Sequence, residues 1–216
     1  MDYALGDFLM FTPEVYLRLF ERTNEALGVG LWGVVAVLVT IPVLLYRAPT
    51  LVRRLVAVAM AAGWGLTAAL FMMRFYAPIN WPVGPFAWVF ALEAGLLMVV
   101  AARVPPARVR LVALAGGSAL LLALSWVTVR ETDTWQAIAL PGVTPDMTAA
   151  TTAVLLMAWP RRARWGLLVI PLLWCAFSAL GHWAMGLWWP MAVPVTGLVF
   201  ILMAALWPPP RSPSVE

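Results

Sequence analysis

Few side chains of this sequence have acid–base or ligand-binding chemistry, and those few lie within long apolar stretches. Glu93 is the acid inside the run FAWVFALEAGLLMVVAAR. An ionised carboxylate at the centre of a bilayer costs about 2.5 to 3.5 kcal/mol, so Glu93 should face other helices and stay protonated or find a partner. The sequence leaves two interpretations open: a site for a proton, cation or substrate, or a structural ion pair with Arg74.

A second polar group lies in the segment IPLLWCAFSALGHWAMG. Cys175, Ser178 and His182 have a spacing that places them on one face of a helix. The helix separates Cys175 from His182 by about 10 Å, which is too far for a direct nucleophile–base pair. We therefore predict a ligand-binding set of Glu93, Arg74, Ser178 and His182. Packing and helix-backbone contacts are the alternative role for the group around His182.

Several chemistries have no residues to support them. The sequence contains no lysine, so a retinal Schiff base cannot form, and its single histidine rules out bis-histidine haem ligation within the chain. No cluster has metal-ligand spacing, and no Walker loop, dinucleotide fingerprint, HExxH or GxSxG motif occurs. We therefore expect no cofactor, no metal, no catalytic residues and no enzyme. A polar stripe of Thr148, Thr151 and Thr152 predicts either contacts between helices or ligand contact.

Composition indicates the elements that must position these side chains. Hydrophobic residues make up 63% and charged residues 11% of the 216-residue chain, which is typical of a protein embedded in lipid. The apolar blocks have the length of about 20 residues that crosses a bilayer as a helix. We predict an all-α transmembrane bundle of about seven spans, at residues 26–46, 55–73, 84–102, 111–129, 147–160, 165–184 and 190–207.

The arginines predict the orientation of these spans. Ten lie in the loops after spans one, three and five and in the tail, and four lie on the other side. Short loops rich in arginine stay in the cytoplasm, so the N-terminus should be outside, the C-terminus inside, and the protein in a bacterial inner membrane. Because the arginines lie at span ends, the net charge of +4 does not indicate a nucleic-acid partner.

The chain divides into three predicted parts. Residues 1–25 form an N-terminal segment, in which residues 12–25 alternate apolar and charged faces at helical spacing, typical of a helix on the membrane surface. Residues 26–208 form the bundle and residues 209–216 a short cytoplasmic tail. Trp81-Pro82 and Trp189-Pro190 occupy matching positions before spans three and seven, which predicts a parallel repeat of three plus one plus three spans. Recurrence by composition alone is the alternative.

Four stretches carry a family resemblance: DFLMFTPEVYLRLFERTN, INWPVGPFAWVFALEA, GVTPDMTAATTAVLL and IPLLWCAFSALGHWAMG. The chain resembles an uncharacterised family of bacterial multi-pass membrane proteins, known as a domain of unknown function, which implies no activity. The predicted topology is also similar to that of SWEET sugar transporters, without their Pro-Gln pair. We predict a small-molecule transporter or ligand-binding membrane protein with a site in the outer half of the bundle. The alternative is a non-catalytic subunit or scaffold for a membrane partner.

Overall fold

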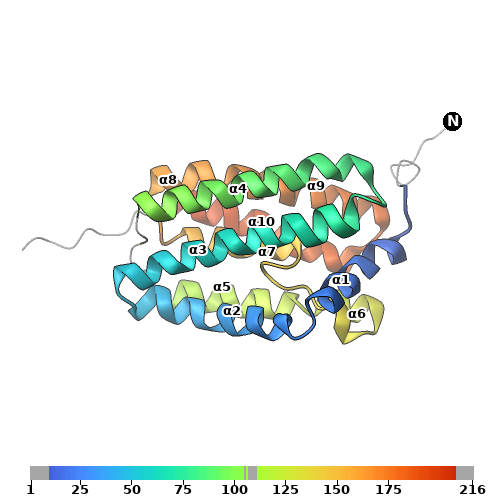
Figure 1. Ribbon diagram of the computed structural model, residues 1–216, viewed down its shortest axis with the longest axis horizontal. Coiled ribbons are helices and arrows are strands. Elements are labelled where there is room, and N and C mark those ends of the chain that lie inside the picture. The colour runs from blue at the N-terminus through green and yellow to red at the C-terminus, as the bar shows by residue number, and fades with distance from the viewer. Residues whose placement is uncertain (1–9, 105, 107–110, 208–216) are drawn as a thin grey trace, which may run out of the picture.

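The computed structural model of the protein describes residues 10–104, 106 and 111–207. All regular structure in these residues is helical, as the sequence predicts. The long helices run side by side along one axis, with α1 and α6 at one end of the bundle and α8 at the other (Figure 1). The predicted tail at 209–216 and the arginines at 108, 110 and 211 lie outside the described residues.

Two groups of helices follow one another along the chain. The first comprises α1 (Pro13–Leu27), α2 (Gly30–Arg47), α3 (Thr50–Leu66) with its π-helical continuation η2 (Thr67–Tyr76), the short η3 (Trp81–Val83) and α4 (Gly84–Arg103). The second comprises α5 (Leu111–Leu124), α6 (Val127–Thr132), η4 (Trp135–Ala137), α7 (Pro145–Leu156), α8 (Arg161–Leu167), α9 (Val169–Met185) and α10 (Trp188–Leu206).

Six segments within the described residues are long and apolar enough to cross a membrane. They are Gly30–Arg47, Thr50–Tyr76, Trp81–Val100, Ala113–Thr132, Arg161–Met185 and Trp188–Leu206. They coincide with six of the seven predicted spans, and they identify the chain as a multi-pass membrane protein. The count of seven, the orientation and the internal repeat stay predictions.

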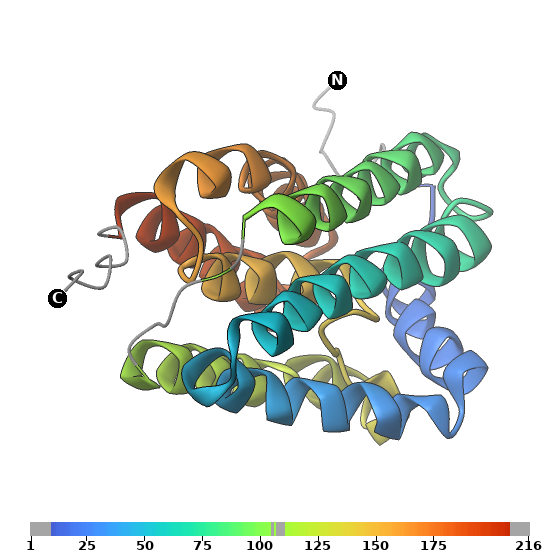
Figure 2. The same ribbon diagram turned by 60° about the vertical axis from the view of Figure 1, so that its left-hand side comes forward.

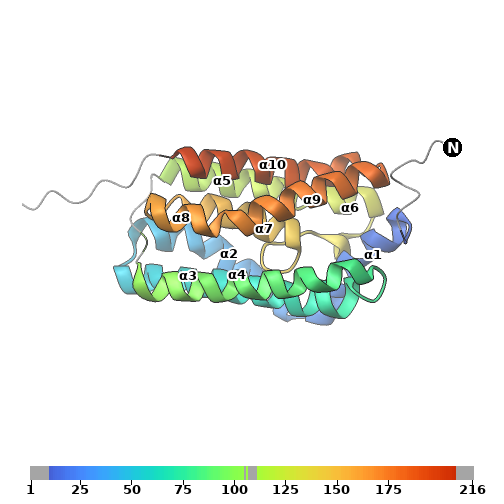
Figure 3. The ribbon, with the colours of Figure 1, turned by 90° about the horizontal axis from the view of Figure 1, so that it is seen from above.

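The remaining predicted span, 147–160, corresponds to α7, a helix of 12 residues at the centre of the bundle. At 1.5 Å per residue it is about 18 Å long, shorter than a hydrocarbon core. Apart from Thr151, every residue of α7 is buried. The helices α3, α5, α9 and α10 pack around it, and Figures 2 and 3 show it enclosed by them. Since α6 and α8 lie at opposite ends, the segment containing α7 carries the chain from one end to the other.

Small residues allow the other helices to approach α7 closely. A Cβ atom at Gly117 of α5 would lie 2.8 Å from a methyl carbon of Val154. A Cβ atom at Gly197 of α10 would lie 2.7 Å from the sulfur of Cys175 and 3.3 Å from the Cβ of Ala150. All three distances are shorter than ordinary van der Waals contact, so glycine at these positions sets how near α5 comes to α7 and how near α10 comes to α7 and α9.

Helix α1 forms at the predicted amphipathic segment and covers one end of the bundle. Thr12 caps it, Pro13 occupies its first position, and its apolar face is buried. Phe20 packs edge-to-face on Phe71 of η2. The side-chain amide of Asn24 donates hydrogen bonds to the carbonyls of Gln136 (2.6 Å) and Ile138 (2.9 Å). The apolar face of α1 therefore contacts protein; its position on a membrane surface stays a prediction.

Candidate functional site

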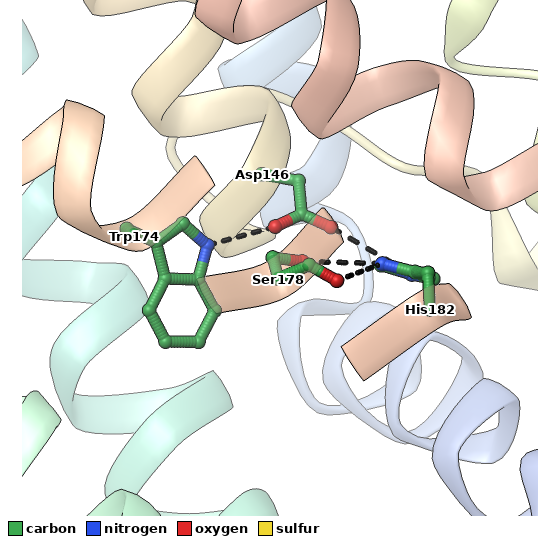
Figure 4. A network of polar contacts seen from close by, with 4 residues as sticks. All are labelled: Asp146, Trp174, Ser178 and His182. Carbon is green, nitrogen blue, oxygen red and sulfur yellow. Dashed lines mark hydrogen bonds and ion pairs between the residues drawn. The ribbon is translucent and has the colours of Figure 1, made fainter. Parts of the chain in front are cut away.

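A buried polar cluster lies where α7 begins and α9 ends. The indole Nε1 of Trp174 donates a hydrogen bond of 2.7 Å to Oδ1 of Asp146, and Nε2 of His182 lies 3.9 Å from Oδ2 of the same carboxylate (Figure 4). Asp146 is 4% exposed and His182 1% exposed. The cluster thus links the first turn of α7 to two turns of α9, without contact with solvent.

The contacts of His182 determine what this cluster can do. Its Nδ1 lies 2.8 Å from the backbone carbonyl oxygen of Ser178 and 3.2 Å from the Ser178 hydroxyl. A carbonyl oxygen can only accept, so Nδ1 carries a proton. In a Ser-His-Asp triad the ring nitrogen that faces the serine must be free to take its proton, and the acid bonds the other N–H. Neither condition holds for Ser178 and Asp146, so the geometry does not support an activated serine.

Tyr16 of α1 closes the cluster from the end of the bundle. Its ring packs edge-to-face on the His182 ring, with centroids 5.3 Å apart. Burial first, and then the negative charge of Asp146, raise the pKa of the Tyr16 hydroxyl well above its ordinary value of 10.0. Tyr16 is therefore neutral at physiological pH, and α1 is fixed over the cluster by ring packing rather than by an ion pair.

Glu93 and Arg74 do not join this cluster, and they do not form the ion pair that was one of the two interpretations of Glu93. Glu93 lies on the buried face of α4 with Ala87, Phe90 and Leu97, and both of its carboxylate oxygens lack a hydrogen-bond partner. Arg74 is exposed, with its guanidinium 5.3 Å from the centre of the Phe75 ring. An unpaired buried carboxyl is favoured in its neutral, protonated form.

Of the four predicted ligand-binding residues, the structure therefore brings together Ser178 and His182 only. Sequence reasoning missed Asp146, because its place after Thr144 and Pro145 is typical of a helix cap. Thr144 precedes α7 but makes no side-chain cap bond, and the Asp146 carboxylate bonds α9. The sequence did contain one indication of this role: Asp146 lies beside an apolar span, and a carboxylate in such a position needs a polar partner.

A groove lies on the side of α7 that faces α2 and α3, and it contains more open space than the polar cluster between α7 and α9. It has a volume of about 390 Å³ and is formed by positions 30 to 41 of α2, positions 59 to 66 of α3, Pro141, Gly142 and four residues of α7. Its walls are mostly apolar or glycine. Loose packing of α2 leaves this space, because only Leu31, Ile41 and Leu45 of that helix are buried.

The polar part of the groove is the predicted threonine stripe of α7. The Thr148 hydroxyl donates to the Thr144 carbonyl (2.6 Å) and accepts from the Gly142 amide (2.8 Å). The Thr152 hydroxyl accepts from the indole of Trp64 (2.8 Å). The Thr151 hydroxyl oxygen is buried and has no hydrogen-bond partner. Two of the three threonines thus join parts of the protein, whereas the hydroxyl of Thr151, a residue of the groove wall, has no partner within the protein.

A second cleft, of about 550 Å³, lies between α5, Val154, Met157 and the end of α10. Its lining consists of glycine and apolar or aromatic side chains, so it lacks the hydroxyl group that distinguishes the first groove. Neither lining includes any of the four predicted ligand-binding residues. Among the described residues, no three His, Cys, Asp or Glu side chains come together to hold a metal ion.

Comparisons with known proteins were made with family models, curated proteins and solved structures, and none of them matches this chain. The resemblance to an uncharacterised bacterial membrane family therefore stays a prediction, and function has to be argued from the geometry.

Proposed function

We propose that this integral membrane protein binds a small, largely apolar molecule in the groove between α2, α3 and α7. The observation that carries the proposal is the unpartnered hydroxyl of Thr151 in the wall of a mostly apolar groove of about 390 Å³. Ligand sites in proteins typically combine apolar walls with a few placed polar groups. The ligand class is an apolar body that carries one hydrogen-bonding group.

The position of the groove agrees with the depth expected for a site. It is lined by positions 30 to 41 of α2 and by positions 59 to 66, in the middle of the continuous segment of α3 and η2, where Gly142 lies against Gly63. The groove therefore extends from the end of the bundle that carries α1, the outer end in the predicted orientation, to the middle of the bundle. A transporter and a receptor both have to bind a ligand. The groove between α2, α3 and α7 supports ligand binding as the proposed function.

The polar cluster around Asp146 has a supporting role in this proposal. Its four side chains are directed at one another, as Figure 4 shows, and the cluster joins α7 to α9 on the side away from the groove. It fixes the start of α7, and so it helps to place Thr148, Thr151 and Thr152 against α2 and α3.

A photolabelling experiment tests the groove. The probe is a long-chain primary alcohol with a diazirine on its chain, added to the purified protein in lipid nanodiscs. We expect label on peptides of α2, α3 and α7. The variant Gly33→Leu fills the groove, because a side chain at Gly33 points into open space, and should lose most of this label. Thr151→Val keeps the shape but removes the hydroxyl, and should weaken binding about fivefold, the value of one hydrogen bond.

The matched control is Gly116→Leu in the second cleft, where a side chain also meets open space. This variant should label like the wild type at α2, α3 and α7. Equal labelling of wild type and Gly33→Leu, or label spread evenly over all lipid-facing helices, would refute the proposal. Size-exclusion profiles establish that each variant is folded before it is labelled.

A further inference from the structure

Arg164 of α8 is a fully buried cation at the end of the bundle opposite α1. Its side chain is 0% exposed. One guanidinium nitrogen, Nη2, donates a hydrogen bond of 2.8 Å to the carbonyl oxygen of Trp207, just after α10. The helix α8, which carries Arg164, packs against α4, α9 and α10 at this end of the bundle (Figure 3).

The other two guanidinium nitrogens of Arg164 are unsatisfied. Nε and Nη1 are buried and have no hydrogen-bond partner. In the part of the chain that the structure describes, the only acidic and basic side chains within ion-pair distance of each other are Asp146 and His182, at the far end of the bundle. A buried guanidinium without a counter-charge is strongly unfavourable, because its lost hydration is not replaced.

A second positive charge on α8 increases this need for an anion. Arg161 lies three residues earlier on the same helix, and its positive charge acts on Arg164. Arg161 is exposed, with its guanidinium 5.6 Å from the centre of the Trp165 ring. One surface cation and one buried cation therefore adjoin at the end of the bundle, where lipid head groups meet a membrane-spanning protein.

We propose that Arg164, with Arg161 beside it, binds a phosphate group, either as the head group of an anionic phospholipid or as free phosphate. Guanidinium groups present several N–H donors in fixed positions, which suits the oxygens of a phosphate. Nε and Nη1 of Arg164 have no exposed surface in the structure, so the long side chain must extend toward the head-group region before these donors bond the phosphate oxygens, as arginine side chains near the ends of membrane helices can do. Arg161, already at the surface, contributes a second positive charge to the same anion. This site lies at the opposite end from the groove, and it does not depend on the proposed ligand.

The thermal unfolding midpoint of the purified protein in a neutral detergent tests this site. Three probes are compared at constant ionic strength: phosphatidylglycerol, phosphatidylcholine and inorganic phosphate. Because a ligand that binds the folded state raises its stability, phosphatidylglycerol should raise the midpoint by roughly 5 °C more than phosphatidylcholine. An equal rise with inorganic phosphate assigns the site to free phosphate, and no rise with it assigns the site to a lipid head group.

Arg164→Gln should abolish the difference between the two lipids. The matched control is Arg162→Gln, which removes the same charge from an exposed position two residues away and should keep the difference. If Arg164→Gln fails to fold, Arg164→Lys keeps the charge without the planar donor set and should reduce the difference at least by half. The proposal is overturned if the wild type shows no preference for any phosphate-bearing anion, or if the Arg164 variants keep the preference of the wild type.

Discussion

Asp146 lies in the first turn of α7, yet its carboxylate bonds side chains of α9. The hydrogen bond from Trp174 and the nearby His182 ring make this acid a link between α7 and α9. Loss of the carboxylate leaves the buried indole N–H of Trp174 without an acceptor.

We predict that Asp146→Ala lowers the free energy of unfolding by about 2 to 3 kcal/mol. The measurement is reversible unfolding in mixed micelles of a mild detergent and dodecyl sulfate. The control Glu25→Ala removes an exposed carboxylate from α1 and should change stability by less than about 0.5 kcal/mol. Similar losses in the two variants would show that Asp146 does not link α7 to α9.

At the scale of residues, the sequence predicts neighbours within a helix but not partners between helices. The spacing of Ser178 and His182 correctly places them on one face of α9, because helical periodicity is local. Pairing Glu93 with Arg74 used depth alone and failed. Arg74 lies between the buried positions Met72 and Tyr76, on the side of η2 that faces away from the core. The partner of Asp146 depends on how α7 packs against α9, which no local pattern reveals.

Among the elements, α7 owes its central position to small residues on the helices around it. Gly197 lets α10 approach both Cys175 and Ala150, and a side chain at this position must push α10 outward. Close contacts of this kind give helices in membranes much of their association energy, because lipid tails are as apolar as the helices themselves.

We predict that Gly197→Ala lowers the free energy of unfolding by about 1 to 3 kcal/mol, the usual cost of adding a methyl group to a well-packed protein core. The double variant Gly197→Ala with Cys175→Ala removes the clashing sulfur and should recover part of this loss. Gly116→Ala is the matched control: its new methyl group meets open space, and the change should be neutral or stabilising. No loss in Gly197→Ala, or no recovery in the double variant, would contradict the packing argument.

Most elements could be predicted from the sequence, because apolar length and end signals are strong. Six predicted spans coincide with long apolar helices, and the amphipathic segment forms α1 after its Thr-Pro start. The prediction for 147–160 was less accurate, since α7 covers Pro145–Leu156 and is enclosed by protein. A buried helix and a lipid-facing helix are both apolar, so composition alone does not distinguish them. The groove was also beyond prediction, because it results from the loose packing of α2.

For the molecule as a whole, more of the described arginines belong to one end of the bundle than to the other. Arg47, Arg103, Arg161 and Arg162 belong to helix ends that meet at the end carrying α8, whereas α1 and α6 lie at the other (Figure 1). This arrangement supports the predicted orientation, since positively charged loops remain in the cytoplasm.

We predict that a cysteine at position 130 reacts with a membrane-impermeant maleimide added from outside, and that a cysteine at position 162 reacts only from the cytoplasmic side. Arg130 and Arg162 are both exposed, so each position is accessible to the reagent. The background carries Cys175→Ala, which removes the one native thiol. Labelling of position 162 from outside, in intact cells or spheroplasts, would indicate the opposite orientation. Labelling of positions 130 and 162 from the same side would show that the chain crosses the membrane an even number of times between these two positions.

The enclosed position of α7 has a consequence for how the chain is made. The helix emerges from the ribosome before α9 and α10, yet its 12 residues are too few to hold it in lipid alone, and Asp146 adds to the cost. Its stable contacts are completed only when α9 and α10 have been synthesised, because these helices cover it. The second half of the protein should therefore enter the bilayer as one cooperative unit, with α7 kept at the insertion machinery until the following helices arrive.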